Sequence, residues 1–390
     1  MVLQDICTPA LIYLVFSITQ IVIDTVQGKY NIAFIKLWVA LIFTILLNYL
    51  CTTGLGIVSW LIVFIPFILM TVIVSLLLLM FGLDPATGKV KISDFNKVKK
   101  DCFKFINSQE TKTNKFKDKN KMIKSYLIPT CFWIAKKTNS KKPYIVGLAG
   151  GQGTGKTTIS SIIKIILEKY FKLKVFKISI DDFYKTRKER LNLSKKIHPM
   201  LATRGVPGTH DVQMMLNFFK KVKSKNFKKI DLPNFNKAVD DRFPKKKWYK
   251  IKDKPDVIIF EGWCVGAKAE VNKTLKKSIN SFEKVNDQKL VWRKHVNQQL
   301  KSKYKKLYSQ LNCMIYLKAK NFSLLQKWRL KQEHKLWLKS KKSSSHKIMN
   351  KSDVFKFMQT YQRITENMFK KMPKYASIVL NLNNNHQIKS

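Results

Sequence analysis

The chain has 390 residues, with 74 Lys and Arg against 24 Asp and Glu, and a formal net charge of +50 at pH 7. This length is sufficient for two or more domains. Residues 1–88 hold only two of the bases and three of the acids, so the excess positive charge lies after Gly88. The composition excludes a single uniform domain and indicates two different polypeptide segments joined near Gly88.

The basic excess does not by itself indicate a nucleic-acid partner. Such partners are bound through phosphate contacts from Lys and Arg, but only seven of the 74 bases are Arg. A general drift of composition toward Lys explains this better, and attraction to an anionic membrane surface is the main alternative. The six cysteines are scattered without a C-x-x-C pair, which favours free thiols in a reducing compartment and no zinc site.

The first 88 residues read as an all-α transmembrane segment of about three helices. No charge occurs from Ile6 to Ile23 or from Leu37 to Leu83, and one span needs roughly 20 apolar residues. A turn is expected at 51–56. Without an internal acid or base to mark a transport path, the segment is interpreted as an anchor.

The orientation of this anchor follows from its few lysines. Lys29 and Lys36 are expected in the first loop, and the basic remainder of the chain follows the third span. The first loop follows one span and the basic remainder follows three, so both lie on the same side of the membrane. The positive-inside tendency makes that side cytoplasmic. We therefore predict a multi-pass membrane protein with its N-terminus outside and residues after the anchor facing the cytoplasm.

Between the anchor and the next domain, residues 89–125 are Lys-rich and are interpreted as a linker or a surface-adhering helix. Apolar residues return at 126–135, where we expect a short helix that packs on a domain covering 126–390.

A phosphate-binding loop opens that domain. The apolar segment 144–148 reads as a buried strand and 157–167 as a helix, and the pattern G-x-x-x-x-G-K-[ST] lies between them. Backbone N–H groups and the helix N-terminus would cradle the phosphates of ATP. Lys156 would reach the β- and γ-phosphates and Thr157 would ligate Mg²⁺; a chance glycine-rich turn is the alternative. The predicted nucleotide-binding residues are Gly150, Gly151, Gln152, Gly153, Thr154, Gly155, Lys156, Thr157 and Thr158.

Two later strands end in acids. The strand 174–180 leads into Asp181 and Asp182, and the strand 256–260 leads into Glu261. Ligands collect at the carboxyl ends of strands in open α/β sheets, so Asp181 is a candidate catalytic base or magnesium ligand and Glu261 a second magnesium ligand. The alternative for the Asp pair is capping of the next helix.

Basic side chains near these acids are candidates for substrate binding. Arg204 and His210 lie in R-G-V-P-G-T-H-D, and Lys237 and Arg242 lie in a charged loop. Arg204 could grip a carboxylate or phosphate with its planar fork, although a structural ion pair explains it equally well. Arg329, on a helix after the strand 313–317, is a candidate lid cation over the triphosphate.

Together, these blocks resemble the D-glycerate 3-kinase family, within the P-loop group that contains uridine kinase and phosphoribulokinase. The resemblance covers roughly 125–390 and rests on G-G-Q-G-T-G-K-T, S-I-D-D-F-Y, R-G-V-P-G-T-H-D, D-D-R-F, F-E-G-W and W-R-L-K-Q-E. It implies a five-stranded parallel sheet flanked by helices and ATP-dependent phosphorylation of a small hydroxylated metabolite. It further implies that Asp181 acts as base and Glu261 organises magnesium. Residues 1–88 are similar to short membrane proteins of large DNA viruses, which implies no chemistry.

Two positions depart from the family pattern. Asn236 stands where the P-x-Y-D-K block has Asp, and Gln362 where the bacterial Y-E-R-L-T tail has Glu. The first departure leaves the acceptor open. We predict an ATP- and Mg²⁺-dependent kinase for the hydroxyl of D-glycerate or a similar hydroxy acid; the alternative is a non-catalytic, membrane-anchored ATP-binding module. A nucleic-acid-dependent ATPase is the weakest hypothesis.

Overall fold

We describe the protein from a computed structural model, which describes residues 6–26, 30–80, 92–110, 115–139, 142–340 and 349–389. Its internal contacts divide the chain into two units. The first contains the helices up to residue 80 and the second contains the residues from 89 onward. The composition break near Gly88 lies outside the described residues.

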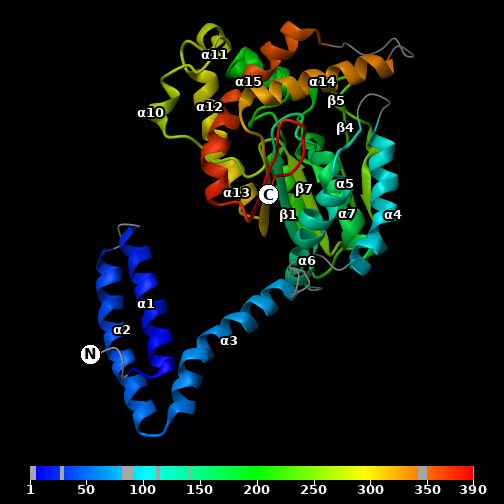
Figure 1. The fold of residues 1–390 in the computed structure, drawn as a ribbon. Coiled ribbons are helices and arrows are strands. Elements are labelled where there is room, and N and C mark those ends of the chain that lie inside the picture. The colour runs from blue at the N-terminus through cyan, green and yellow to red at the C-terminus, as the bar shows by residue number, and fades with distance from the viewer. Residues whose placement is uncertain are drawn as a thin grey trace. The chain divides into compact units, whose positions relative to one another are not determined.

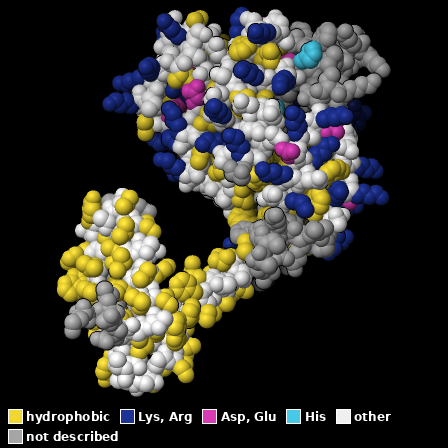
Figure 2. Space-filling view, viewed as in Figure 1, with side chains coloured by type: hydrophobic (Ala, Val, Ile, Leu, Met, Phe, Trp, Pro, Cys, Tyr) yellow, Lys and Arg dark blue, Asp and Glu magenta, His cyan; other side chains and the backbone are white. Residues whose placement is uncertain are grey.

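The first unit consists of α1 (Thr8–Val26), α2 (Tyr30–Thr52) and α3 (Gly56–Met80). All three are long and apolar enough to cross a membrane. Large apolar side chains cover the visible surface of this unit (Figure 2), and many of them are exposed. Helices that are apolar all round are typical of membrane spans. The three expected helices are present, with Pro66 inside α3.

Two links fasten α1 to α2, and both correct expectations from the sequence. Cys7 and Cys51 form a disulfide, so these two thiols are not free. Nearer the other end of the helix pair, the Lys36 ammonium lies 2.5 Å from the carboxylate of Asp24, which is 8% exposed. Lys36 therefore lies inside α2 rather than in a loop, and the anchor does contain an internal acid and base. Lys29 lies outside the described residues.

A five-stranded parallel sheet forms the centre of the second unit (Figure 1). The strands are ordered β2-β7-β1-β8-β9, and every neighbouring pair is parallel. This confirms the expected α/β fold with a five-stranded parallel sheet. The strand bounds are β1 Tyr144–Gly150, β2 Val175–Ser179, β7 Val257–Gly262, β8 Cys313–Lys318 and β9 Ile378–Asn381.

Helices cover both faces of the sheet, because its strands are apolar on both sides. Along β1, Val146 and Leu148 point into one core with the helix α7 (Lys156–Lys169). Ile145 and Ala149 point into the other. The second core is closed by α9 (Val212–Val222), α12 (Val291–Gln299), η5 (Leu300–Tyr304) and α13 (Lys305–Tyr308).

Residues 92–109 are a helix of this unit rather than a linker. In α4 (Ile92–Gln109), Phe95, Val98, Cys102 and Ile106 are buried in the first core, and the helix packs against α7. The spacing of these four residues places them on one helix face. Their burial stabilises α4 on the domain while its lysines face solvent. The apolar helix expected at 126–135 follows as η1 (Met122–Leu127) and α6 (Ile128–Lys137).

The remaining elements connect or cover this core. The helices are α5 Lys119–Lys121, η2 Ile180–Phe183, α8 Arg187–Lys196, η3 Pro199–Leu201, η4 Lys245–Lys247, α10 Asn272–Leu275, α11 Ser281–Asn286, α14 Phe322–Ser340, α15 Lys351–Lys371 and η6 Met372–Lys374. Two small antiparallel pairs are β3 Ile230–Leu232 with β6 Tyr249–Ile251, and β4 Phe235–Asn236 with β5 Asp241–Arg242.

Candidate active site

The phosphate-loop sequence forms the turn between β1 and α7. Gly153 and Gly155 have φ values of 82° and 83°, in the left-handed region that glycine adopts without strain. A Cβ at Gly151 would lie 2.3 Å from a Leu325 side-chain carbon, and one at Gly153 would lie 2.7 Å from Cβ of Trp328. The loop therefore needs glycine both for its conformation and for its close packing against α14.

Lys156 points back over this loop. Its ammonium donates to the Gly151 carbonyl at 3.0 Å. Burial lowers the pKa of Lys156, while the carboxylates of Glu261 and Asp181 act in the opposite direction. A buried ammonium with a carbonyl partner favours a nearby anion. The residues present thus fit the phosphates of a nucleotide.

Thr157 and Glu261 meet at the start of α7. The Thr157 hydroxyl donates to Glu261 Oε1 at 3.1 Å, and the buried Ser160 hydroxyl donates to Oε2 at 3.2 Å. Within the described ranges, no cluster of three or more His, Cys, Asp or Glu could hold a metal. The site offers a hydroxyl and carboxylates, which suit Mg²⁺ when phosphate oxygens and water complete its coordination.

The adjacent Asp181 and Asp182 have different surroundings. Ser179 and Asp182 form a reciprocal cap around η2, in which Asp182 accepts from the Ser179 N–H at 3.3 Å. Burial raises the pKa of Asp182 to about 6. Asp181 instead accepts from the Lys237 ammonium at 2.8 Å. Burial raises the pKa of Asp181, but the charge and hydrogen bond of Lys237 outweigh it, so the net shift is downward. The capping alternative therefore describes Asp182.

Two predicted substrate residues are engaged within the chain. Arg204 pairs with Asp240 and donates to the Lys237 carbonyl, and Arg242 pairs with Asp211 at 3.3 Å. Asp211 also caps α9 through the Met214 N–H. Their guanidinium groups fix the 232–242 loop, whereas Lys237 lies directly beside Asp181.

His210 is deeply buried beside the acids. It is 2% exposed, and its ring stacks on Tyr184 with centroids 4.4 Å apart. Nδ1 lies 2.7 Å from the Tyr304 hydroxyl. Burial lowers the pKa of His210 to about 4, although the charge of Asp181 opposes this. The imidazole is therefore neutral at pH 7.

The two departures from the family pattern have local partners. Asn236 accepts from the Ala238 N–H at 3.0 Å, closing the turn of the β4–β5 pair. Gln362 accepts from Asn280 at 3.1 Å and donates to Glu366 at 2.7 Å on α15. The two amide oxygens accept from Ala238 and Asn280 as a carboxylate would, whereas the bond to Glu366 uses the Gln362 amide N–H and could not be donated by Glu.

Arg329 lies against the phosphate loop, but its side chain has other partners. It pairs with Glu333 one turn along α14, and its guanidinium lies 5.6 Å from the centroid of the Phe357 ring. The backbone nitrogen of Arg329 would lie 3.3 Å from a Cβ at Gly153. A role as lid cation would require Arg329 to leave Glu333.

A cavity of about 460 Å³ adjoins the phosphate loop. The loop, the 115–122 segment, α14 and the chain end at 382–389 line it. His386 stacks on Trp328 with centroids 3.9 Å apart, and its Nε2 lies 2.9 Å from the Gly153 carbonyl. Because it adjoins the phosphate loop, this cavity is the candidate pocket for the base of the nucleotide, the candidate base pocket below. The sequence analysis missed it, because its walls come from segments at opposite ends of the domain.

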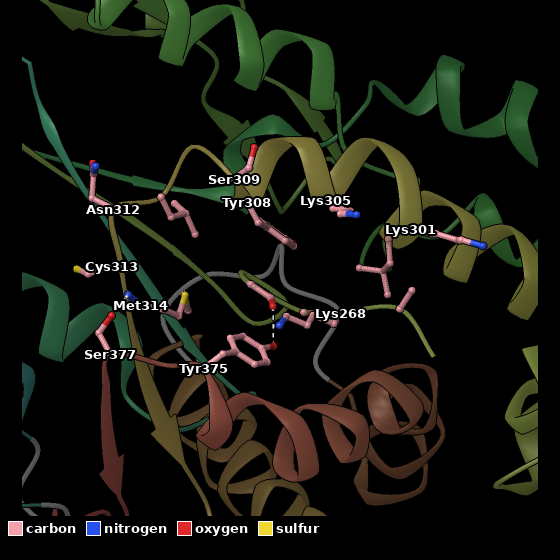
Figure 3. A pocket seen from close by; sticks show the side chains of 15 residues that line it. Lys268, Lys301, Lys305, Tyr308, Ser309, Asn312, Cys313, Met314, Tyr375 and Ser377 are labelled. Carbon is pink, nitrogen blue, oxygen red and sulfur yellow. Dashed lines mark hydrogen bonds between the residues drawn. The ribbon is translucent and has the colours of Figure 1, made fainter. Parts of the chain in front are cut away.

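Another cavity, of about 580 Å³, lies elsewhere (Figure 3). Met314, Leu311 and Tyr308 contribute to its wall, and Lys268 lies over the Tyr375 ring at 3.8 Å. It contains none of the predicted site residues, so its size does not make it the active site.

Comparisons with known proteins agree with this geometry. No family model matches the chain. The "Uncharacterized kinase mug58" of Schizosaccharomyces pombe is 30% identical over 251 residues, covering 62% of this chain and 83% of the relative. The chloroplastic D-glycerate 3-kinase of Arabidopsis thaliana is 28% identical over 229 residues, covering 53% of this chain and 47% of that protein.

Among solved structures, a D-glycerate 3-kinase from Cryptococcus neoformans superposes with a TM-score of 0.56 at 23% identity, covering 68% of this chain and 96% of the other. This likeness supports the fold alone. The Schizosaccharomyces relative, of which the chain covers 83% at 30% identity, places the sequence among kinases. The chain belongs to the family of P-loop kinases that includes D-glycerate 3-kinase.

Proposed function

We propose that the protein phosphorylates a hydroxyl of a small hydroxy acid, D-glycerate or a similar compound, with ATP and Mg²⁺. The observation that carries the proposal is the contact of Thr157 with Glu261 at 3.1 Å, beside the half-buried Lys156, whose pKa responds to both Glu261 and Asp181. A phosphate loop, a metal-side acid and a second acid are the parts that phosphoryl transfer needs.

In the proposed reaction, Asp181 takes the proton of the acceptor hydroxyl. The hydroxyl oxygen forms a bond to the γ-phosphorus, and the bond from that phosphorus to the β–γ bridging oxygen breaks, which leaves ADP. Thr157 and Glu261 would hold Mg²⁺, which supplies charge neutralisation on the phosphates. Lys156 stabilises the negative charge of the transferring group.

Lys237 would position the acceptor. Its side chain is 61% exposed and bonds Asp181, so an acidic acceptor could approach both groups together. The cation would bind the acid group of the acceptor while the carboxylate receives the hydroxyl proton. This arrangement favours a hydroxy acid over a neutral alcohol.

The bond of Asn236 to the Ala238 N–H weakens the non-catalytic alternative. Asn236 replaces a family carboxylate, which favours that alternative, but its amide oxygen satisfies the turn as the carboxylate could. In this chain the partner of Asp181 is Lys237, which the replacement leaves in place. We infer that turnover is retained.

An acceptor screen on the full chain with labelled ATP tests the proposal. Hydroxy acids, nucleosides and pantothenate are compared, and transfer to a hydroxy acid is the expected result. Asp181→Asn should lower kcat by about 10²–10⁴-fold, the range of general-base catalysis, and should leave ATP binding intact. Asp182→Asn is the matched control. ATP binding without transfer to any acceptor would favour the non-catalytic module.

We further propose that α1, α2 and α3 cross a membrane and that the kinase unit faces the cytoplasm. Disulfides persist in oxidising compartments, so the Cys7–Cys51 bond supports an external position for that end of the α1–α2 pair. One further span, α3, returns the chain to the other side. The remaining cysteines in the described chain are free and buried, as a reducing cytosol allows.

Labelling of intact cells with a membrane-impermeant thiol reagent tests this orientation. In a variant whose other cysteines are Ser, Cys51 has no disulfide partner and should react from outside. A new cysteine at exposed Lys220 should react only after permeabilisation. The reverse pattern would contradict the orientation and leave the kinase proposal untouched.

A further inference from the structure

A tyrosine of α15 packs at the edge of the sheet where the acids of the candidate active site lie. Tyr361 is 5% exposed. Its ring stands edge-on to the ring of Trp263, with centroids 4.8 Å apart, and Trp263 comes two residues after Glu261 in the sequence. The ring of Phe357 lies 4.9 Å away, centroid to centroid. Because two aromatic neighbours hold the ring, its hydroxyl has a defined position.

The hydroxyl of Tyr361 lies against the backbone of the R-G-V-P-G-T-H-D loop. A Cβ at Gly205 would lie 2.5 Å from the Tyr361 hydroxyl oxygen, so glycine is needed there to admit the hydroxyl. The Gly205 N–H donates to the Thr209 hydroxyl at 3.1 Å, and its carbonyl accepts from the Trp263 indole at 3.0 Å. Gly205 is therefore a fixed wall beside the hydroxyl, and its N–H is already engaged.

The Tyr361 hydroxyl is open to a ligand. Among the residues that the structure describes, it has no hydrogen-bond partner. It is also not one of the fully enclosed polar atoms that lack a partner in that part of the chain, so solvent can reach it. A phenolic hydroxyl can both donate and accept a hydrogen bond. A polar atom of a bound molecule could therefore complete its hydrogen bonding.

The charges around Tyr361 indicate where the hydroxyl opens and what it can bind. Burial raises the pKa of Tyr361, and the charge of Asp181 raises it further, against the opposing charges of Arg204 and Arg329. All three are predicted site residues, and the hydroxyl stays protonated at pH 7. Both guanidinium groups are paired with acids of their own. Because like charges repel, a place beside the Asp181 carboxylate suits a neutral oxygen better than another carboxylate.

We propose that Tyr361 determines acceptor specificity, because its hydroxyl donates a hydrogen bond to a second, non-reacting hydroxyl of the acceptor. This contact rests on the proposed kinase function, and it narrows the substrate class to acids that carry two hydroxyl groups. Lys237 and Asp181 keep the roles proposed above, toward the acid group and the reacting hydroxyl. The third contact with the acceptor then comes from α15, which is remote in sequence from the phosphate loop and from the strands that end in acids.

Binding of acceptor analogues to the full chain in detergent tests this contact. D-glycerate is compared with 3-hydroxypropanoate and with D-lactate, each of which lacks one of its two hydroxyls. Calorimetry in the presence of Mg²⁺ and a non-hydrolysable ATP analogue measures the three affinities. Tyr361→Phe should weaken the binding of D-glycerate about tenfold and leave one analogue unaffected, the one that lacks the hydroxyl bound by Tyr361. That analogue should retain the hydroxyl that the enzyme phosphorylates.

A second tyrosine provides the matched control. Tyr361→Phe keeps the ring and hence its packing on Trp263 and Phe357. Tyr375→Phe also removes one hydroxyl, which donates to the Gly266 carbonyl at 2.8 Å beside the cavity of Figure 3, and it should leave all three affinities unchanged. An equal loss for D-glycerate and both analogues in Tyr361→Phe, or no loss for any of them, would overturn the proposal.

Turnover separates the role of Tyr361 from the proposed function. If the wild type phosphorylates D-glycerate and Tyr361→Phe keeps the same preference over the analogues, the role of Tyr361 is refuted and the kinase proposal stands. If binding depends on Tyr361 but no phosphate is transferred, the contact is supported and the non-catalytic module is favoured. If no hydroxy acid binds or is phosphorylated, the proposed function fails and the contact fails with it.

Discussion

The Lys237 ammonium lies 2.8 Å from the Asp181 carboxylate and holds that acid in its charged form. Asp181 follows β2, while Lys237 belongs to the loop between β4 and β5. The loop that would bind the acceptor therefore also lowers the pKa of the proposed catalytic base. Binding of an acidic acceptor at Lys237 would therefore change the environment of Asp181 as the hydroxyl arrives.

Removing Lys237 should move the pH dependence of the reaction. Asp181 acts as a base only when ionised, and Lys237 lowers its pKa. In Lys237→Gln the pKa rises, so activity is lost at a higher pH as the solution is acidified. The acceptor KM should also rise about tenfold. Profiles of kcat and kcat/KM against pH measure both effects. Lys245→Gln, exposed on η4, is the control; an unmoved acidic limb would contradict the assigned role.

Glu261→Gln should weaken the binding of magnesium by the enzyme. The carboxylate accepts from Thr157 and Ser160, and a neutral amide is a poorer ligand for a hard cation. We expect the Mg²⁺ concentration for half-maximal activity to rise about tenfold or more. Glu168→Gln, in a partly exposed pair with Lys164 on α7, should leave it unchanged. An unaltered magnesium curve in Glu261→Gln would remove Glu261 from the metal site.

His386→Ala should weaken nucleotide binding selectively. The ring stacks on Trp328 and bonds the Gly153 carbonyl, so its loss opens one wall of the candidate base pocket. The expected result is a several-fold higher KM for ATP with an unchanged KM for the acceptor. His386→Phe retains the stack and should recover much of the affinity. If both variants bind ATP like the wild type, the adenine base of ATP binds outside this cavity.

Glu283→Ala should destabilise the kinase unit. Glu283 is 1% exposed, and its oxygens accept from Arg363 Nε and Nη2 at 2.7 Å each, while Arg293 lies 3.5 Å away. Breaking a buried pair leaves uncompensated charge and costs about 3–5 kcal/mol. Urea unfolding followed by tryptophan fluorescence measures it. Glu168→Ala removes the more accessible partner of Lys164 and should lower the free energy of unfolding by less than about 1 kcal/mol. An equal loss of stability in Glu283→Ala and Glu168→Ala would argue against the buried network.

The sequence was most informative where local pattern and fold coincide. The buried strand 144–150 carries no charge, and 257–262 is apolar up to Glu261. The glycines before Lys156 are needed because the loop packs closely against α14. The contact of Thr157 with Glu261 follows, because parallel strands bring their carboxyl ends to one edge of the sheet.

Other features depend on long-range pairing that a linear pattern does not contain. Arg204 could be assigned to a substrate or to an ion pair, and its partner Asp240 became evident only with the folded loop. Cys7 and Cys51 are 44 residues apart and meet because two helices pair. In α4 the apolar spacing was present, but the many lysines between its buried positions obscured it.

The position of α4 and the 115–122 segment has a practical consequence for handling this enzyme. The chain that follows the three apolar helices first contributes α4 to the kinase core and then one side of the candidate nucleotide-base pocket before it reaches β1. Trimming the protein at the start of the recognisable kinase motifs would remove that side and expose the apolar surface beneath it. A soluble version must therefore begin ahead of Ile92, and a preparation cut at residue 125 would understate the affinity of the enzyme for its nucleotide.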